Sequence, residues 1–129
     1  MKRWLDVATV ALTALLLFLF AVLALRGLID PQSASQRFGT AVSDPAGALF
    51  FRVYLSRNLV IAVTGAVLLL LHQWRALAIL LSVAGALPVF DMSVLSLNGV
   101  SPPVFHPVAL VLLVITALLL WRRALSGTT

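Results

Sequence analysis

Four long apolar runs, separated by short polar segments, dominate the sequence. The first run, from Val7 to Leu25, contains no charged residue. At 1.5 Å per residue it is about 28 Å long, which suffices to cross a hydrocarbon core of about 30 Å together with its flanks. We therefore predict an all-α fold, a four-transmembrane-helix bundle, with spans at about residues 5–26, 45–71, 75–97 and 104–121.

The first run has a second interpretation, as a cleaved signal peptide. The apolar region of a signal peptide is about 7–15 residues long and is followed by small residues at the cleavage site. The run in this chain is longer and ends at Leu25 and Arg26. These features favour a retained first span.

The longest polar segment, residues 26–47, contains two Asp-Pro pairs. Asp30 precedes a proline and predicts a short surface helix that continues to Phe38 and stops at Gly39. Asp44 is expected to be the N-cap of the second span, with Pro45 at its first position, because proline there loses no hydrogen bond.

Composition agrees with membrane burial and excludes several other classes. The chain is 62% apolar and 10% charged, whereas soluble domains have about 25% charged residues. Its 129 residues leave room for one domain, which we predict to be a single integral membrane domain over residues 1–129. The absence of cysteine excludes disulfides and thiolate metal sites.

The net charge of +5 does not indicate nucleic-acid binding, because the basic residues are scattered at the ends of apolar runs rather than gathered on one face. One side of the predicted bundle carries Lys2, Arg3, Arg75, Arg122 and Arg123. On the opposite side, the loop between the first two spans carries Arg26 and Arg37. The positive-inside rule therefore predicts a multi-pass protein of the inner (plasma) membrane with both termini in the cytoplasm. Trp4, Trp74 and Trp121 are the expected interfacial anchors on the cytoplasmic side.

Two stretches carry ionisable residues inside predicted spans. Arg57 and Asn58 lie in the second span, with Arg57 about 18 Å along the helix from Pro45. Asp91 lies in the third span, about 10 Å below its outer end. Because a charge is costly at these depths, we expect an Arg57–Asp91 pair. Such a pair is either a structural link between helices or part of a functional site.

The neighbours of this pair complete a candidate polar site. Tyr54, Arg57 and Asn58 share one helical face by their spacing. Pro88 is expected to kink the third span beside Asp91, and His106, at the start of the fourth span, could share or relay a proton. The candidate catalytic residues are Asp91, His106 and Arg57, and the candidate ligand-binding residues are Tyr54, Arg57, Asn58 and Asp91. No metal or other cofactor is predicted, because the two histidines are far apart in the sequence and the chain has no Cys or Glu.

Several stretches resemble a known family. They are RFG (residues 37–39), DPAGALFFRVYLSRNL (44–59), ALPVFDMSVL (86–95) and FHPVALVLL (105–113). Together they are similar to a family of small, uncharacterised four-span membrane proteins found mainly in bacteria, with some fungal members. In that family a glycine often precedes the arginine of the second span, whereas this chain has Ser56 there. The resemblance implies the fold and topology and brings no established reaction.

Three functions are compatible with these features. The first is a pocket open to the outer leaflet that binds a lipophilic small molecule, or isomerises or cyclises it by proton transfer. The second is a small transporter or exporter subunit, although the acid-free first span counts against it. The third is an accessory membrane protein with no site of its own. The expected partners are the lipid bilayer and, in the first case, the lipophilic molecule; whether the protein is an enzyme, and its oligomeric state, stay open.

Overall fold

The computed structural model describes residues 2–126, with side chains described for residues 4–126. The side chains of Lys2 and Arg3, on which the predicted orientation partly rests, lie outside this range. The helices are α1 (Lys2–Ile29), α2 (Pro31–Phe38), α3 (Pro45–Leu70), α4 (Trp74–Ala84), α5 (Ala86–Leu97) and α6 (Phe105–Ser126). Four stretches are long and apolar enough to cross a membrane, with α4 and α5 together forming the third. The predicted all-α, four-span fold is confirmed.

Both predicted Asp-Pro helix starts are confirmed. The backbone N–H of Ser33 donates to Asp30 Oδ1 at 3.1 Å, and that of Gly47 donates to Asp44 Oδ1 at 2.9 Å. These bonds satisfy N–H groups that the first helical turn leaves without partners. Gly39 follows α2 with φ of +118°, a left-handed conformation that glycine adopts without steric cost.

The third span is interrupted, as expected, but the interruption lies one turn before Pro88. The α-helix breaks at Gly85, between α4 and α5, and Pro88 is buried within α5. Proline has no N–H to donate to the carbonyl four residues earlier, which is that of Ala84, and its ring crowds that carbonyl. The effect of a proline is therefore located at the preceding turn of the helix.

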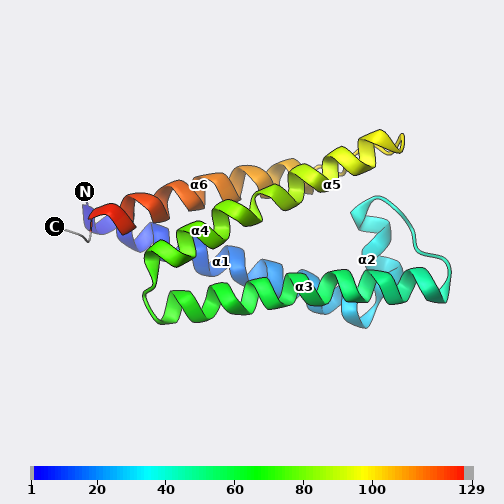
Figure 1. Cartoon of the computed structure of the whole chain (residues 1–129), viewed down its shortest axis with the longest axis horizontal. Coiled ribbons are helices and arrows are strands. Elements are labelled where there is room, and N and C mark those ends of the chain that lie inside the picture. Colours follow the sequence, from blue (N-terminus) through cyan, green and yellow to red (C-terminus); the bar gives the residue numbers. More distant parts are fainter. Residues whose placement is uncertain (1, 127–129) are drawn as a thin grey trace.

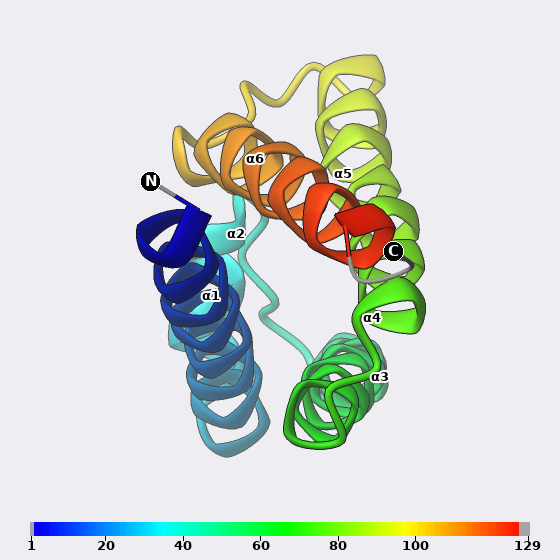
Figure 2. The same ribbon diagram turned by 90° about the vertical axis from the view of Figure 1, so that its left-hand side faces the viewer.

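The helices form two pairs. α1 packs along α3, and α4 packs along α6 (Figure 1). α1 begins and α6 ends at the same end of the bundle, where a cluster of buried leucine and alanine side chains joins α1, α4 and α6. Toward the opposite end the pairs separate, and no Cα atom of α3 lies within 8 Å of one in α5. The short helix α2 lies between the separated pairs, as Figures 1 and 2 both show.

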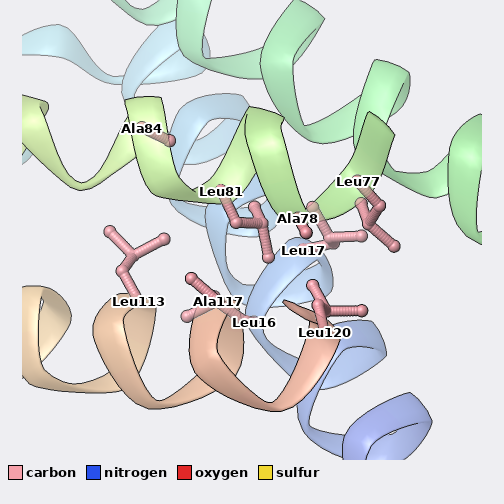
Figure 3. Close-up of a cluster of buried hydrophobic side chains, with 9 residues drawn as sticks. All are labelled: Leu16, Leu17, Leu77, Ala78, Leu81, Ala84, Leu113, Ala117 and Leu120. Carbon is pink, nitrogen blue, oxygen red and sulfur yellow. The ribbon is translucent and has the colours of Figure 1, made fainter. Parts of the chain in front are cut away.

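The cluster that closes the narrow end is entirely apolar (Figure 3). It consists of Leu16, Leu17, Leu77, Ala78, Leu81, Ala84, Leu113, Ala117 and Leu120. Because lipid tails are as apolar as these side chains, close van der Waals packing rather than water exclusion holds such helices together. Gly65 of α3 lies directly against the Leu17 side chain of α1. Because Gly65 has no side chain, α1 and α3 can approach each other closely there.

Polar contacts join the end of α6 to α1 and to α4. Arg122 donates to Asp6 Oδ1 at 2.8 Å, and the guanidinium of Arg123 lies 4.0 Å from the ring centre of Trp74. The indole N–H of Trp121 donates to Ser82 Oγ at 3.1 Å. These contacts hold the narrow end together, so the separation of the helix pairs occurs at the other end.

Candidate functional site

A cavity of about 480 Å³ lies among α1, α2, α3, α5 and α6, at the end of the bundle where the helix pairs separate. Its polar lining residues are Arg26, Asp30, Ser33, Arg37, Tyr54, Asn58, Asp91 and His106, and its other lining residues are apolar. The volume falls within the range of about 300–1,000 Å³ that is typical of small-molecule sites, and an apolar wall with a few polar groups is also typical of them.

Tyr54 and Asp91 connect the two separated helices across the cavity. The Tyr54 hydroxyl donates to Asp91 Oδ2 at 3.2 Å. Tyr54 lies on α3 and Asp91 on α5, so this contact joins helices whose backbones are far apart. Asn58 lies one turn after Tyr54 on the same face of α3 and lines the same cavity. The predicted stretches of the second and third spans thus face each other across a cavity instead of packing directly.

His106 is the second partner of Asp91. Its ring is buried, with the residue only 2% exposed. Nδ1 lies 3.8 Å from Asp91 Oδ2, and Nε2 lies 3.4 Å from the carbonyl oxygen of Phe38. The sequence-based expectation that His106 approaches Asp91 is met by the structure.

The two ring nitrogens of His106 face different groups. A carbonyl oxygen can only accept a hydrogen bond, so the contact with Phe38 is a hydrogen bond when Nε2 carries the hydrogen. The other nitrogen, Nδ1, faces the Asp91 carboxyl at 3.8 Å, a distance at which the two groups form an ion pair when the imidazole is protonated. An acid and a base that can exchange a proton therefore lie side by side at the cavity.

Aromatic rings hold these groups in place. The ring of Phe38 makes edge contacts at centroid distances of 5.0 Å to His106 and 5.6 Å to Tyr54. Phe51 lies 6.0 Å from both Phe38 and Tyr54. Edge contacts of this kind stabilise aromatic pairs beyond the area they bury. The cluster therefore limits the rotamers of the groups that face Asp91.

The predicted Arg57–Asp91 pair does not form. Arg57 is exposed on the bundle surface, does not line the cavity, and takes part in no ion pair among residues 4–126. Successive residues of a helix point about 100° apart. Since Tyr54 and Asn58 face the cavity, Arg57 points to one side of it. Arg57 thus neither links α3 to α5 nor sets the charge of Asp91.

Sequence reasoning missed the contribution of α2 and of the end of α1. It predicted α2 correctly as a helix but placed it on the surface, whereas Phe38 contacts His106 and Arg26, Asp30 and Arg37 line the cavity. One signal was present: Arg26 and Arg37 are basic residues on the side of the bundle where such residues are scarce.

The histidines are far apart in the structure as well. His72 follows α3 at the narrow end, with φ of +55°, and its ring contacts Trp74 at a centroid distance of 5.4 Å. Within the described part of the chain, no three His, Cys, Asp or Glu side chains lie close enough together to hold a metal ion.

Comparison with known proteins identifies the family. A model described as a domain of unknown function, DUF4267, matches residues 6–120. The match covers most of the chain, so the protein belongs to this family, and the resemblance to an uncharacterised membrane family is confirmed. No curated protein and no solved structure matches the chain. The family description assigns no role, so the cavity and its side chains are the basis for a function.

Proposed function

We propose that this DUF4267 protein binds a lipophilic small molecule in the cavity between its separated helix pairs. The observation that carries the proposal is the cavity of about 480 Å³ among membrane-spanning helices, with apolar walls and a few convergent polar groups. Apolar walls suit a molecule dissolved in the bilayer, while Tyr54, Asn58, Asp91 and His106 would fix its orientation through hydrogen bonds.

The closeness of Asp91 and His106 beside the cavity favours a second candidate function, isomerisation of the bound molecule. The Asp91 carboxylate would remove a proton from a carbon atom, and the His106 imidazolium would donate its proton to another atom of the ligand. Transfer of the acquired proton from Asp91 to His106 would then restore the starting state. General acid–base catalysis needs both groups within reach of the ligand, and both line the cavity.

Transport is less well supported than binding. A transporter would have to open the narrow end of the bundle alternately with the cavity end. That narrow end is closed by a packed cluster that includes Leu77, Leu113 and Leu120, each no more than 1% exposed.

Filling the cavity tests the binding proposal. The probe is a photoactivatable long-chain alcohol, added to the protein in nanodiscs of zwitterionic lipid. We expect ultraviolet labelling of peptides from the cavity wall in the native protein. In Ala109→Trp, labelling should fall by about tenfold or more, because Ala109 lines the cavity and an indole occupies space that the ligand needs.

Ala14→Trp is the matched control, because Ala14 is exposed on α1 and does not line the cavity. It should be labelled like the native protein. Equal labelling of both tryptophan variants and the native protein, or labelling confined to lipid-facing peptides, would contradict the proposed binding site.

We also propose that the cavity end of the bundle faces outward and that both termini are cytoplasmic, as the positive-inside rule indicates. The chain has no cysteine, so a single introduced thiol reports its own location. Thr40→Cys is exposed between α2 and α3 and should react with a membrane-impermeant maleimide added to intact cells. Reaction only after the membrane is permeabilised would reverse the orientation.

A further inference from the structure

We infer that the ligand is an amphiphile with an anionic group at one end, and that Arg26 and Arg37 bind this group at the mouth of the cavity. The inference rests on the proposed binding function and names the class of ligand. It follows from where the cavity lining is exposed, from the positive charges of Arg26 and Arg37 at that place, and from the carboxyl of Asp91 elsewhere in the lining.

The mouth of the cavity is where its lining residues are exposed. Leu23 is 58% exposed, Ile29 80% and Phe105 41%. They belong to α1 and to the start of α6, so the exposed part of the cavity lining includes both of these helices. Exposed apolar residues at a membrane-spanning surface face lipid, so a molecule can pass from the bilayer into the cavity without crossing water.

Two arginines stand at this mouth. Arg26 lies in the last turn of α1 and Arg37 in the last turn of α2, and both are exposed cavity-lining residues. Neither takes part in an ion pair among residues 4–126. The nearby carboxylate of Asp30 accepts a hydrogen bond from the start of α2 and so has a structural role. A guanidinium without a partner recognises carboxylates and phosphates by paired hydrogen bonds.

The other polar groups of the cavity indicate where an anionic group does not fit. Asp91 lines the cavity with Tyr54 and His106, and its carboxyl would repel an anion. Much of the remaining wall is apolar, with the buried residues Leu55 and Pro88 as examples. An anionic group therefore fits at the arginines, and the apolar body of the same molecule fits along the apolar wall.

Arginines at a membrane surface also contact lipid head groups in general, and a matched variant separates the two roles. Arg57 is exposed on α3, has no ion-pair partner among the described side chains, and does not line the cavity. Arg57→Gln removes one positive charge without changing the mouth. Arg26→Gln and Arg37→Gln, singly and together, remove the charges that line it.

The experiment measures displacement of the photoactivatable alcohol by oleate, by oleyl alcohol and by inorganic phosphate, in zwitterionic nanodiscs. We expect oleate to compete better than oleyl alcohol with the native protein. In the double variant the affinity for oleate should fall by about tenfold to a hundredfold, because hydrogen bonds between charged groups are lost. The affinity for oleyl alcohol should change by less than about threefold, and Arg57→Gln should behave like the native protein.

Three results would overturn the inference: equal affinity for oleate and oleyl alcohol in the native protein, an equal loss for oleate in Arg57→Gln, or displacement of the alcohol by inorganic phosphate alone. The last would indicate a site for free anions. In each of these cases the alcohol still binds, so the proposed function survives. Failure of the native protein to bind the alcohol or oleate would instead contradict the proposed function itself.

Discussion

Asp91→Asn is expected to slow proton exchange between the protein and a bound lipophilic ketone by about 10²–10⁴-fold, the usual contribution of a general acid or base. In the native protein, Asp91 Oδ2 accepts a hydrogen bond from the Tyr54 hydroxyl at 3.2 Å and lies 3.8 Å from Nδ1 of His106. An amide in place of the carboxyl keeps the size of the side chain but cannot accept a proton at neutral pH.

The measurement uses a long-chain methyl ketone, whose hydrogens next to the carbonyl exchange with solvent, in nanodiscs prepared in D₂O. Each exchange event replaces one hydrogen of the ketone with deuterium and raises its mass by the difference between the two isotopes, which mass spectrometry follows with time. Native protein should accelerate exchange over empty nanodiscs. If it does not, or if Asp91→Asn exchanges as fast as the native protein, the proposed isomerisation chemistry is wrong, while ligand binding is tested separately.

Asp44→Asn is the matched control for this substitution. Asp44 lies outside the cavity and caps α3 by accepting a hydrogen bond from Gly47. Asparagine is about as good an N-cap as aspartate, so the variant changes the same charge and should retain both fold and exchange rate. A similar loss in both variants would indicate a general effect of charge.

Leu120→Ala is expected to lower the free energy of unfolding by about 2–4 kcal/mol, the range for large-to-small changes in tightly packed cores. Leu120 is 0% exposed and belongs to the cluster that joins α1, α4 and α6. Removing its side chain leaves a void in the cluster where these three helices pack together. In a membrane this lost van der Waals contact is the main interaction between helices.

Leu118→Ala supplies the comparison on the same helix. Leu118 is 65% exposed, so lipid tails contact it and would refill the space, and we expect a change of less than about 0.5 kcal/mol. Both variants are measured by titration with a denaturing detergent in mixed micelles. Equal destabilisation by the two changes would mean that the cluster does not hold the narrow end together.

The elements of the fold were largely predictable from local patterns. Apolar run lengths located the four spans, and Asp30 and Asp44 located the starts of two helices because capping depends on residues only three positions apart. The interruption of the third span was predicted from Pro88 for the same reason. Within the candidate site, the approach of His106 to Asp91 was expected from their common position at one end of the bundle.

The direction in which the Arg57 side chain points from α3 was not predictable from local patterns. In a soluble protein the apolar face of a helix identifies the side that packs. The second span is apolar nearly all round, because lipid and protein interior are both apolar solvents for it. Nothing in the pattern therefore distinguishes the face that carries Tyr54 and Asn58 from the side that carries Arg57, and an ion pair was expected where the structure has a tyrosine hydroxyl.

The sequence by itself determined that this is an all-α membrane protein with four spans, and where α2 and α3 begin, because these depend on composition and on short-range hydrogen bonding. Only the tertiary structure decided that the helix pairs separate at one end, that α2 lies between them, and that Asp91 meets Tyr54 and His106 while Arg57 faces away. Those outcomes depend on shape-specific contacts between segments far apart in the chain, such as the ring of Phe38 against His106. Hydropathy carries no information about such contacts when every face of a helix can lie in an apolar environment.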